Sequence, residues 1–69
     1  GTPLAGLTRR ERQVLILLAK GFRLKEIAER LELSPRTVDS HRSSLMKRLD
    51  IHKTTDLVRL ALRAGLIRE

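Results

Sequence analysis

The stretch from Ser34 to Leu49 limits the possible folds more than any other part of the chain. A serine followed by a proline is typical of a helix start. The Ser34 hydroxyl can cap the first turn, and Pro35 lacks only an N–H that this turn leaves unbonded in any case. Apolar residues then recur at helical spacing. The stretch therefore predicts one helix over residues 35–49.

This predicted helix has two opposite faces when its residues are spaced at about 100°. The first is a narrow apolar face that can anchor the helix to a core, and it contains Val38, His41, Leu45 and Leu49. The second is polar and cationic, with Asp39 on its flank, and it contains Arg36, Ser40, Ser43 and Lys47. Short or forked hydrogen-bonding side chains bind base edges and phosphates. The pattern therefore indicates a helix that lies in a DNA groove.

The composition narrows the class of partner. The 69 residues suffice for one small domain, and 15 Lys and Arg against 8 Asp and Glu give a net charge of +7. That charge favours nucleic acid, then an anionic membrane surface, although a generic basic surface explains it too. The single aromatic residue, Phe22, argues against RNA modules and single-strand binding that depend on base stacking. The longest apolar run, residues 14–19, is too short to cross a bilayer, and the absence of cysteine fits the cytoplasm.

Three more helices are predicted from apolar residues at helical spacing. They cover residues 9–20, 24–31 and 55–64. No stretch alternates polar and apolar residues with period two, so we expect no strand. We predict an all-α, compact four-helix domain over residues 7–69. Residues 1–6 are expected to be a linker or a cloning remnant, because Gly and Pro are too dense there for an element.

The ends of two of these helices carry capping signals. Thr8 and Glu11 have the spacing of a capping box, in which each side chain accepts a hydrogen bond from the other residue's backbone N–H. Thr54 or Thr55 can cap the last helix. The helix over residues 24–31 is expected to be poorly capped.

Only three residues separate the predicted helices 24–31 and 35–49, which is the spacing of a helix-turn-helix. Ala28 is small where the two helices would cross closely. In this motif the first helix crosses the DNA backbone, and the second enters the major groove with its N-terminal residues. An ordinary αα-corner in a helical bundle has the same spacing, but the polar face and the net charge favour the DNA-binding motif.

Many positions of this chain match one family. They are Leu7-Thr8, Glu11-Arg12, Val14-Leu15, Gly21, Lys25-Glu26-Ile27-Ala28, Leu31, Ser34-Pro35-Arg36-Thr37-Val38, His41, Leu49, Leu57-Val58, Ala61-Leu62 and Gly65-Leu66. On these positions, residues 7–67 resemble the LuxR-type DNA-binding domain of NarL/FixJ response regulators and quorum-sensing regulators, and the FixJ-like branch in particular. The resemblance implies the C-terminal effector domain of a bacterial transcription factor. It also implies dimeric binding to paired half-sites on double-stranded DNA.

The resemblance also assigns site residues. The family's base-contacting positions correspond to Asp39, Ser40 and Ser43, and Thr37 matches a phosphate-contacting position. NarL-like members carry Lys at positions 39 and 43. Asp39 cannot bind a phosphate, so it is expected either to accept a hydrogen bond from a cytosine amino group or to orient Arg36 or Arg42.

Three further positions depart from the family pattern. Glu32 and Asp50 replace the usual glycines, and Asp50 is expected at positive φ. Lys53 replaces the serine that often caps the last helix of the family.

The remaining basic residues on the predicted recognition helix are candidates for phosphate contacts. Arg36 and Lys47 lie at the two ends of the polar face, where they would bind phosphates, and a solvated charged surface is the alternative. Arg42 lies at the edge of the apolar face. It could contact a phosphate or pair with Glu11, and the residues alone do not decide between the two.

Other roles have weaker support. His41 and His52 have no partners at ligand spacing, so we expect a structural, half-buried His41 and no metal, cofactor or enzyme activity. Val58 and Leu62 could form a dimer seam or belong to the core. Two competing functions are a protein-interaction module that docks on a partner such as RNA polymerase, and a membrane-active cationic peptide. The short helices with Gly and Pro breaks argue against the peptide.

Overall fold

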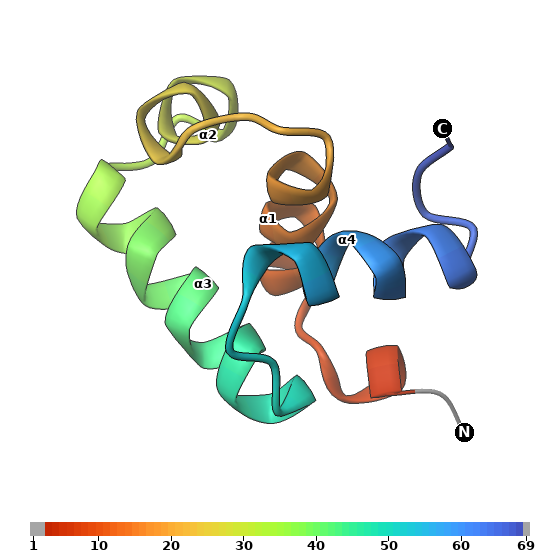
Figure 1. The fold of residues 1–69 in the computed structure, drawn as a ribbon. Helices are drawn as coiled ribbons and strands as arrows, with labels where there is room; N and C mark the ends of the chain where they lie inside the picture. Colours follow the sequence, from red (N-terminus) through yellow and green to blue (C-terminus); the bar gives the residue numbers. More distant parts are fainter. Residues whose placement is uncertain (1–2, 69) are drawn as a thin grey trace.

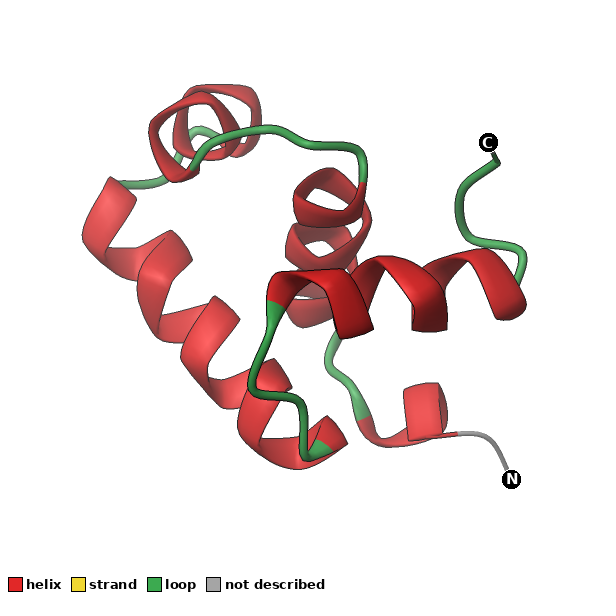
Figure 2. Cartoon of the chain, viewed as in Figure 1, coloured by secondary structure: helices red, strands yellow, loops and turns green. Residues whose placement is uncertain are grey.

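The computed structural model describes residues 3–68, which form one short 3-10 helix and four α-helices (Figure 1). In chain order these are η1 (Pro3–Gly6), α1 (Arg9–Ala19), α2 (Leu24–Leu31), α3 (Pro35–Leu49) and α4 (Thr54–Arg63). The described residues contain no strand, as Figure 2 shows. The all-α prediction is confirmed, and α2 and α3 have the predicted bounds. The α1 helix begins as predicted and ends one residue earlier, and α4 both begins and ends one residue earlier than predicted.

Side-chain caps explain where α1 and α3 begin. The Thr8 Oγ1 accepts a hydrogen bond from the Glu11 N–H at 3.1 Å, and the Thr8 N–H donates to Glu11 Oε1 at 2.8 Å. This is the predicted capping box. At α3 the Ser34 Oγ accepts from the Thr37 N–H at 3.1 Å, and Pro35 occupies the first helical position. Both starts are therefore encoded in neighbouring residues.

The starts of α2 and α4 are less well capped. Arginine has no acceptor, so at α2 only half of a capping box forms: the Arg23 N–H donates to Glu26 Oε1 at 2.9 Å. The α4 cap is Lys53, which makes no side-chain cap hydrogen bond. The expectation that Thr54 or Thr55 caps this helix is wrong, because the helix already begins at Thr54.

Two carboxylate residues end α2 and α3 in a left-handed conformation. Glu32 has φ 57° and Asp50 has φ 54°, so the expected positive φ of Asp50 is confirmed. Side chains with a Cβ rarely adopt this conformation, and glycine is usual there because it meets no steric penalty. The two caps therefore store a small amount of backbone strain.

The core lies where α1 packs against α3 and α4, while α2 packs against α3. Its fully buried large side chains are Leu15, Ile27, Leu45, Leu57, Val14 and Val38. Val38 and Leu45 confirm the predicted anchoring face of α3, with His41 and Leu49 half-buried beside them. Ala64, the last residue of the predicted helix over residues 55–64, follows the end of α4 and is exposed.

The segment before α1 differs from the expectation. Residues 3–6 form η1, which contacts α3, and the Leu4 side chain is buried in the core. The expectation that no element forms before residue 7 is wrong for these residues. The apolar Leu4 decides the matter, because burying it stabilises the short turn more than the flanking Gly and Pro weaken it. Residues 1–2 of the predicted linker lie outside the described residues.

Candidate nucleic-acid interface

One side of α3 faces outward along its whole length. Figures 1 and 2 show α3 along one edge of the molecule, with α1 and α2 against its inner side. The polar residues predicted for its outer face are all exposed, and they are Arg36, Ser40, Ser43 and Lys47. Because Val38 and Leu45 fix the opposite face in the core, this exposed face has a defined orientation relative to the domain.

The N-terminus of α3 combines exposed hydroxyls with an arginine. The Ser34 Oγ and the Thr37 Oγ1 lie 2.8 Å apart, and both residues are exposed. Arg36 lies between them in the chain and is exposed too. Helix N-termini carry a partial positive charge and favour phosphate groups. This end of α3 is therefore suited to an anion.

Asp39 and Arg42 form an ion pair on the flank of α3. The Arg42 Nε donates to Asp39 Oδ1 at 2.9 Å and Arg42 Nη2 donates to the same oxygen at 2.8 Å. The Arg42 Nη1 lies 3.5 Å from the Met46 sulfur. Of the predicted partners for Asp39, Arg42 is the one that pairs with it. The alternative pairing of Arg42 with Glu11 is wrong.

Glu11 instead meets Arg48, which follows Arg42 by six residues in α3. Arg48 Nη1 lies 3.5 Å from Glu11 Oε1 and also donates a short hydrogen bond to the Gly6 carbonyl. The Glu11 side chain is 3% exposed. The Thr8 N–H, followed by the Ser44 hydroxyl, lowers the pKa of Glu11, and these effects outweigh the burial that would raise it. Sequence reasoning found the capping role of Glu11 and considered a link to α3, but it named Arg42 rather than Arg48 as the partner, because the sequence offers no local signal for this contact.

The histidines have no visible functional partners. His41 is half-buried, as expected for a structural residue. His52 Nε2 lies 3.3 Å from Asp50 Oδ1, and both side chains are exposed. Within residues 3–68, no group of three His, Cys, Asp or Glu side chains is placed to hold a metal ion.

Val58 and Leu62 lie outside the fully buried core. Both are half-buried on α4, and they line a surface pocket of about 320 Å³ together with Ala19, Ile67 and two basic residues. Partial exposure of two apolar side chains on one helix face is compatible with a contact between domains. The dimer seam itself stays a prediction.

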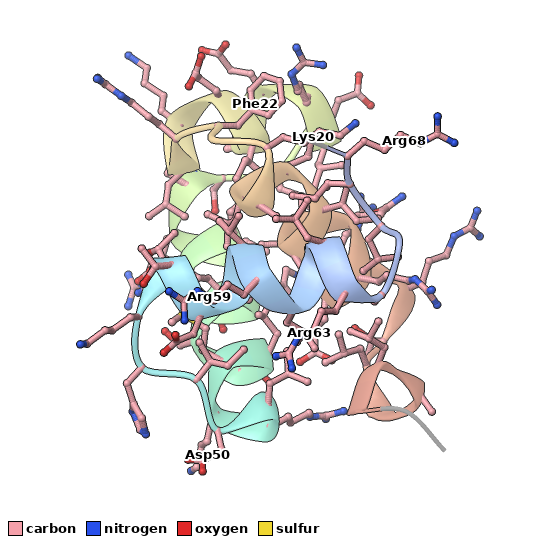
Figure 3. All side chains as sticks on the ribbon, turned by 45° about the vertical axis from the view of Figure 1, so that its right-hand side comes forward. Lys20, Phe22, Asp50, Arg59, Arg63 and Arg68 are labelled. Atoms are coloured by element: carbon pink, nitrogen blue, oxygen red, sulfur yellow. The ribbon has the colours of Figure 1, made fainter. Side chains whose placement is uncertain are left out.

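Basic side chains also occur on elements other than α3. Figure 3 shows Arg59 and Arg63 on α4, and the pocket beside Val58 and Leu62 is lined by Lys20 and Arg68. All four are exposed. Net charge alone therefore does not distinguish α3 from the other helices; its exposed hydroxyls, its ion pair and its N-terminus make it the candidate interface. Among the described residues, no helix has both the length and the apolar character to cross a bilayer.

Comparison with characterised proteins found response regulators. Residues of this chain are 43% identical over 65 positions to the response regulator UvrY of Escherichia coli, covering 94% of this chain and 30% of that protein. They are 46% identical over 66 positions to the transcriptional regulatory protein FixJ of Azorhizobium caulinodans, covering 96% of this chain and 31% of that protein. The chain thus spans about a third of the length of these relatives.

Structure and family comparisons agree. The crystal structure of full-length FixJ from B. japonicum matches with a TM-score of 0.84 at 39% identity, covering 96% of this chain and 32% of that one. The family model described as "Bacterial regulatory proteins, luxR family" matches residues 5–61. This chain therefore belongs to the LuxR family of bacterial regulatory proteins, as a helix-turn-helix DNA-binding domain of the NarL/FixJ type.

Proposed function

We propose that this domain binds double-stranded DNA sequence-specifically, as the C-terminal effector domain of a cytoplasmic bacterial transcriptional regulator. The observation that carries the proposal is the exposed polar face of α3, from Arg36 to Lys47, opposite a face anchored in the core. A 15-residue helix is about 22 Å long. It can lie in a major groove about 12 Å wide while its flanks approach the phosphates on both sides.

Base reading is assigned to Asp39, Ser40 and Ser43. The two serine hydroxyls are exposed on the outer face, where each can donate to or accept from a base edge. Asp39 uses Oδ1 for its ion pair, so Oδ2 is available to accept a hydrogen bond from a cytosine amino group. These short side chains require α3 to approach the base edges closely.

Phosphate binding is assigned to Arg36, Thr37, Arg42 and Lys47. Arg36 and Thr37 lie at the N-terminus of α3, Lys47 lies in its last turns, and Arg42 lies on its flank. Contacts at both ends of a helix fix its register on the duplex without reading its sequence.

Salt and sequence dependence test these roles. We expect a duplex obtained by selection from random sequences to bind more tightly than a scrambled duplex in fluorescence anisotropy. Affinity should fall with salt by a log–log slope of about −0.9 for each phosphate contacted.

R36A and K47A should weaken binding to both duplexes alike, and S40A and S43A should change the preferred bases. R63A, which removes a charge from α4, is the matched control. Equal affinity for selected and scrambled duplexes would contradict the base-reading assignment.

Dimerisation on paired half-sites is part of the same proposal. Val58 and Leu62 are the proposed seam, because they are partly exposed apolar residues on one face of α4. A duplex with two symmetric half-sites should bind cooperatively, and L62E should abolish the cooperativity while leaving the affinity for a single half-site unchanged. A thermal melt checks that L62E still folds. Cooperativity that survives this substitution would place the seam elsewhere.

A further inference from the structure

Asp39 places a negative charge beside the face of α3 that the proposed function turns toward DNA. A carboxylate near a polyanion lowers affinity through like-charge repulsion, unless a cation compensates it. The Asp39 side chain is 48% exposed, so a duplex can approach it. Because its charge alone would weaken DNA binding, its presence on this helix calls for another explanation.

The Arg42 guanidinium contacts both Asp39 and Met46. An arginine guanidinium has five N–H donors. Nε and Nη2 each direct one of them to Asp39 Oδ1, and Nη1 lies 3.5 Å from the Met46 sulfur, a weak acceptor. One N–H on each terminal nitrogen remains outside these contacts. Two parallel donors on a planar group match two phosphate oxygens, which is the geometry of the strongest arginine–phosphate contacts.

The location of Arg42 favours a phosphate contact over a base contact. Asp39, Arg42 and Met46 lie on the flank of α3, between the buried face of Val38 and Leu45 and the outer face. A helix in the major groove directs its outer face to the bases and its flanks to the sugar–phosphate walls. Arg42 therefore lies at the wall of the groove.

We propose that Asp39 and Arg42 act as one coupled pair, in which Asp39 is a positioning residue that holds the Arg42 guanidinium ready for a DNA phosphate. In return, Arg42 neutralises Asp39, so that the carboxylate can lie next to the bases without repelling the duplex. This inference rests on the proposed function. It adds that the two residues contribute to binding together rather than separately.

A double-mutant cycle measures the coupling. D39A, R42A and the double variant are compared with the wild-type chain by fluorescence anisotropy, on the selected duplex and on a scrambled one. R42A should weaken binding to both duplexes by about tenfold, because it removes a phosphate contact and leaves Asp39 unpaired. The double variant should bind the scrambled duplex at least about threefold more tightly than R42A, since the repelling carboxylate is gone.

Two controls separate positioning from charge. R42K keeps the charge but lacks the fork, so its affinity should lie between those of the wild type and R42A. R63A removes one charge from α4 and should weaken binding less than R42A does. All variants are first checked by thermal unfolding, where an exposed ion pair three residues apart should change little.

The outcomes distinguish this pair from the wider proposal. If the wild-type chain prefers the selected duplex but the double variant equals the product of the two single effects within about twofold, the coupling is refuted and the base-reading proposal stands. If the wild type shows no preference between duplexes, the proposed function fails. The cycle on the scrambled duplex still decides the coupling in that case, because phosphate contacts do not depend on sequence.

Discussion

Two carboxylate–arginine pairs include residues of α3, and they differ mainly in how deeply the carboxylate is buried. Glu11 and Arg48 join α1 to the C-terminal half of α3, and the Glu11 side chain is 3% exposed. Asp39 and Arg42 lie within α3, at 48% and 36% exposure. The buried carboxylate also accepts a hydrogen bond from the Thr8 N–H, and Ser44 helps to lower its pKa, whereas both hydrogen bonds to Asp39 come from Arg42.

The same chemistry therefore serves two purposes. A buried carboxylate with several donors stabilises the fold, because removing it leaves those donors without a partner. An exposed ion pair adds little stability, since water and salt screen it. The fold therefore does not require the Asp39–Arg42 pair, and the pair is available for the role in DNA binding that we propose for it.

The largest expected effect is on stability and comes from E11A. We expect a loss of about 2 kcal/mol in the free energy of unfolding, measured by urea denaturation, because the Thr8 N–H loses its acceptor and Arg48 loses its partner. D39A is the matched variant and should lose less than about 0.5 kcal/mol. Equal losses in the two variants would show that burial is not what separates the pairs.

Acid should remove the contribution of Glu11. Its pKa is lowered in the folded state from the ordinary value of 4.5, so the fold favours the ionised form. The resulting stability is fully present above 4.5 and is lost as the pH falls through the folded-state value. The free energy of unfolding of the wild type should therefore exceed that of E11Q by about 1 kcal/mol at neutral pH. This difference should shrink as the pH is lowered. A pH-independent difference would contradict the assignment.

The two arginines should give opposite results. R48A should lower the stability by about 0.5–1 kcal/mol, because its contacts with Glu11 and the Gly6 carbonyl are partly exposed. It should leave the preferred DNA sequence unchanged. R42A should leave the melting temperature nearly unchanged while weakening DNA binding. If R42A lowered the stability and R48A weakened DNA binding instead, the roles assigned to the two pairs would be wrong.

The smallest effect concerns two carboxylates outside both pairs. Glu32 and Asp50 hold positive φ, which costs a residue with a Cβ about 1 kcal/mol. Glycine removes that cost but gains freedom when unfolded, so E32G and D50G should each stabilise the chain by about 0.5 kcal/mol. E29G, inside α2, should instead lose about 1 kcal/mol in the same denaturation experiment. No gain at either cap would mean that the Glu32 and Asp50 side chains form compensating contacts.

Local patterns were enough to predict most of the fold. The bounds of α2 and α3 and the Thr8–Glu11 capping box all depend on residues within one turn of each other, whereas the positive φ of Asp50 was expected from the family resemblance. The exposed face of α3 followed from its opposite apolar face for the same reason. The cap of α4 was misplaced because two adjacent threonines offered equally good starts.

Contacts between distant segments were not predictable in this way. The sequence by itself determined the helices, their main caps and the residues that α3 turns outward, because these depend on spacing along the chain. Only the tertiary structure decided that Glu11 meets Arg48 rather than Arg42, that Leu4 is buried, and that Val58 and Leu62 lie at the edge of the core. Each of these depends on how helices far apart in the chain pack together, and short-range periodicity carries no information about that.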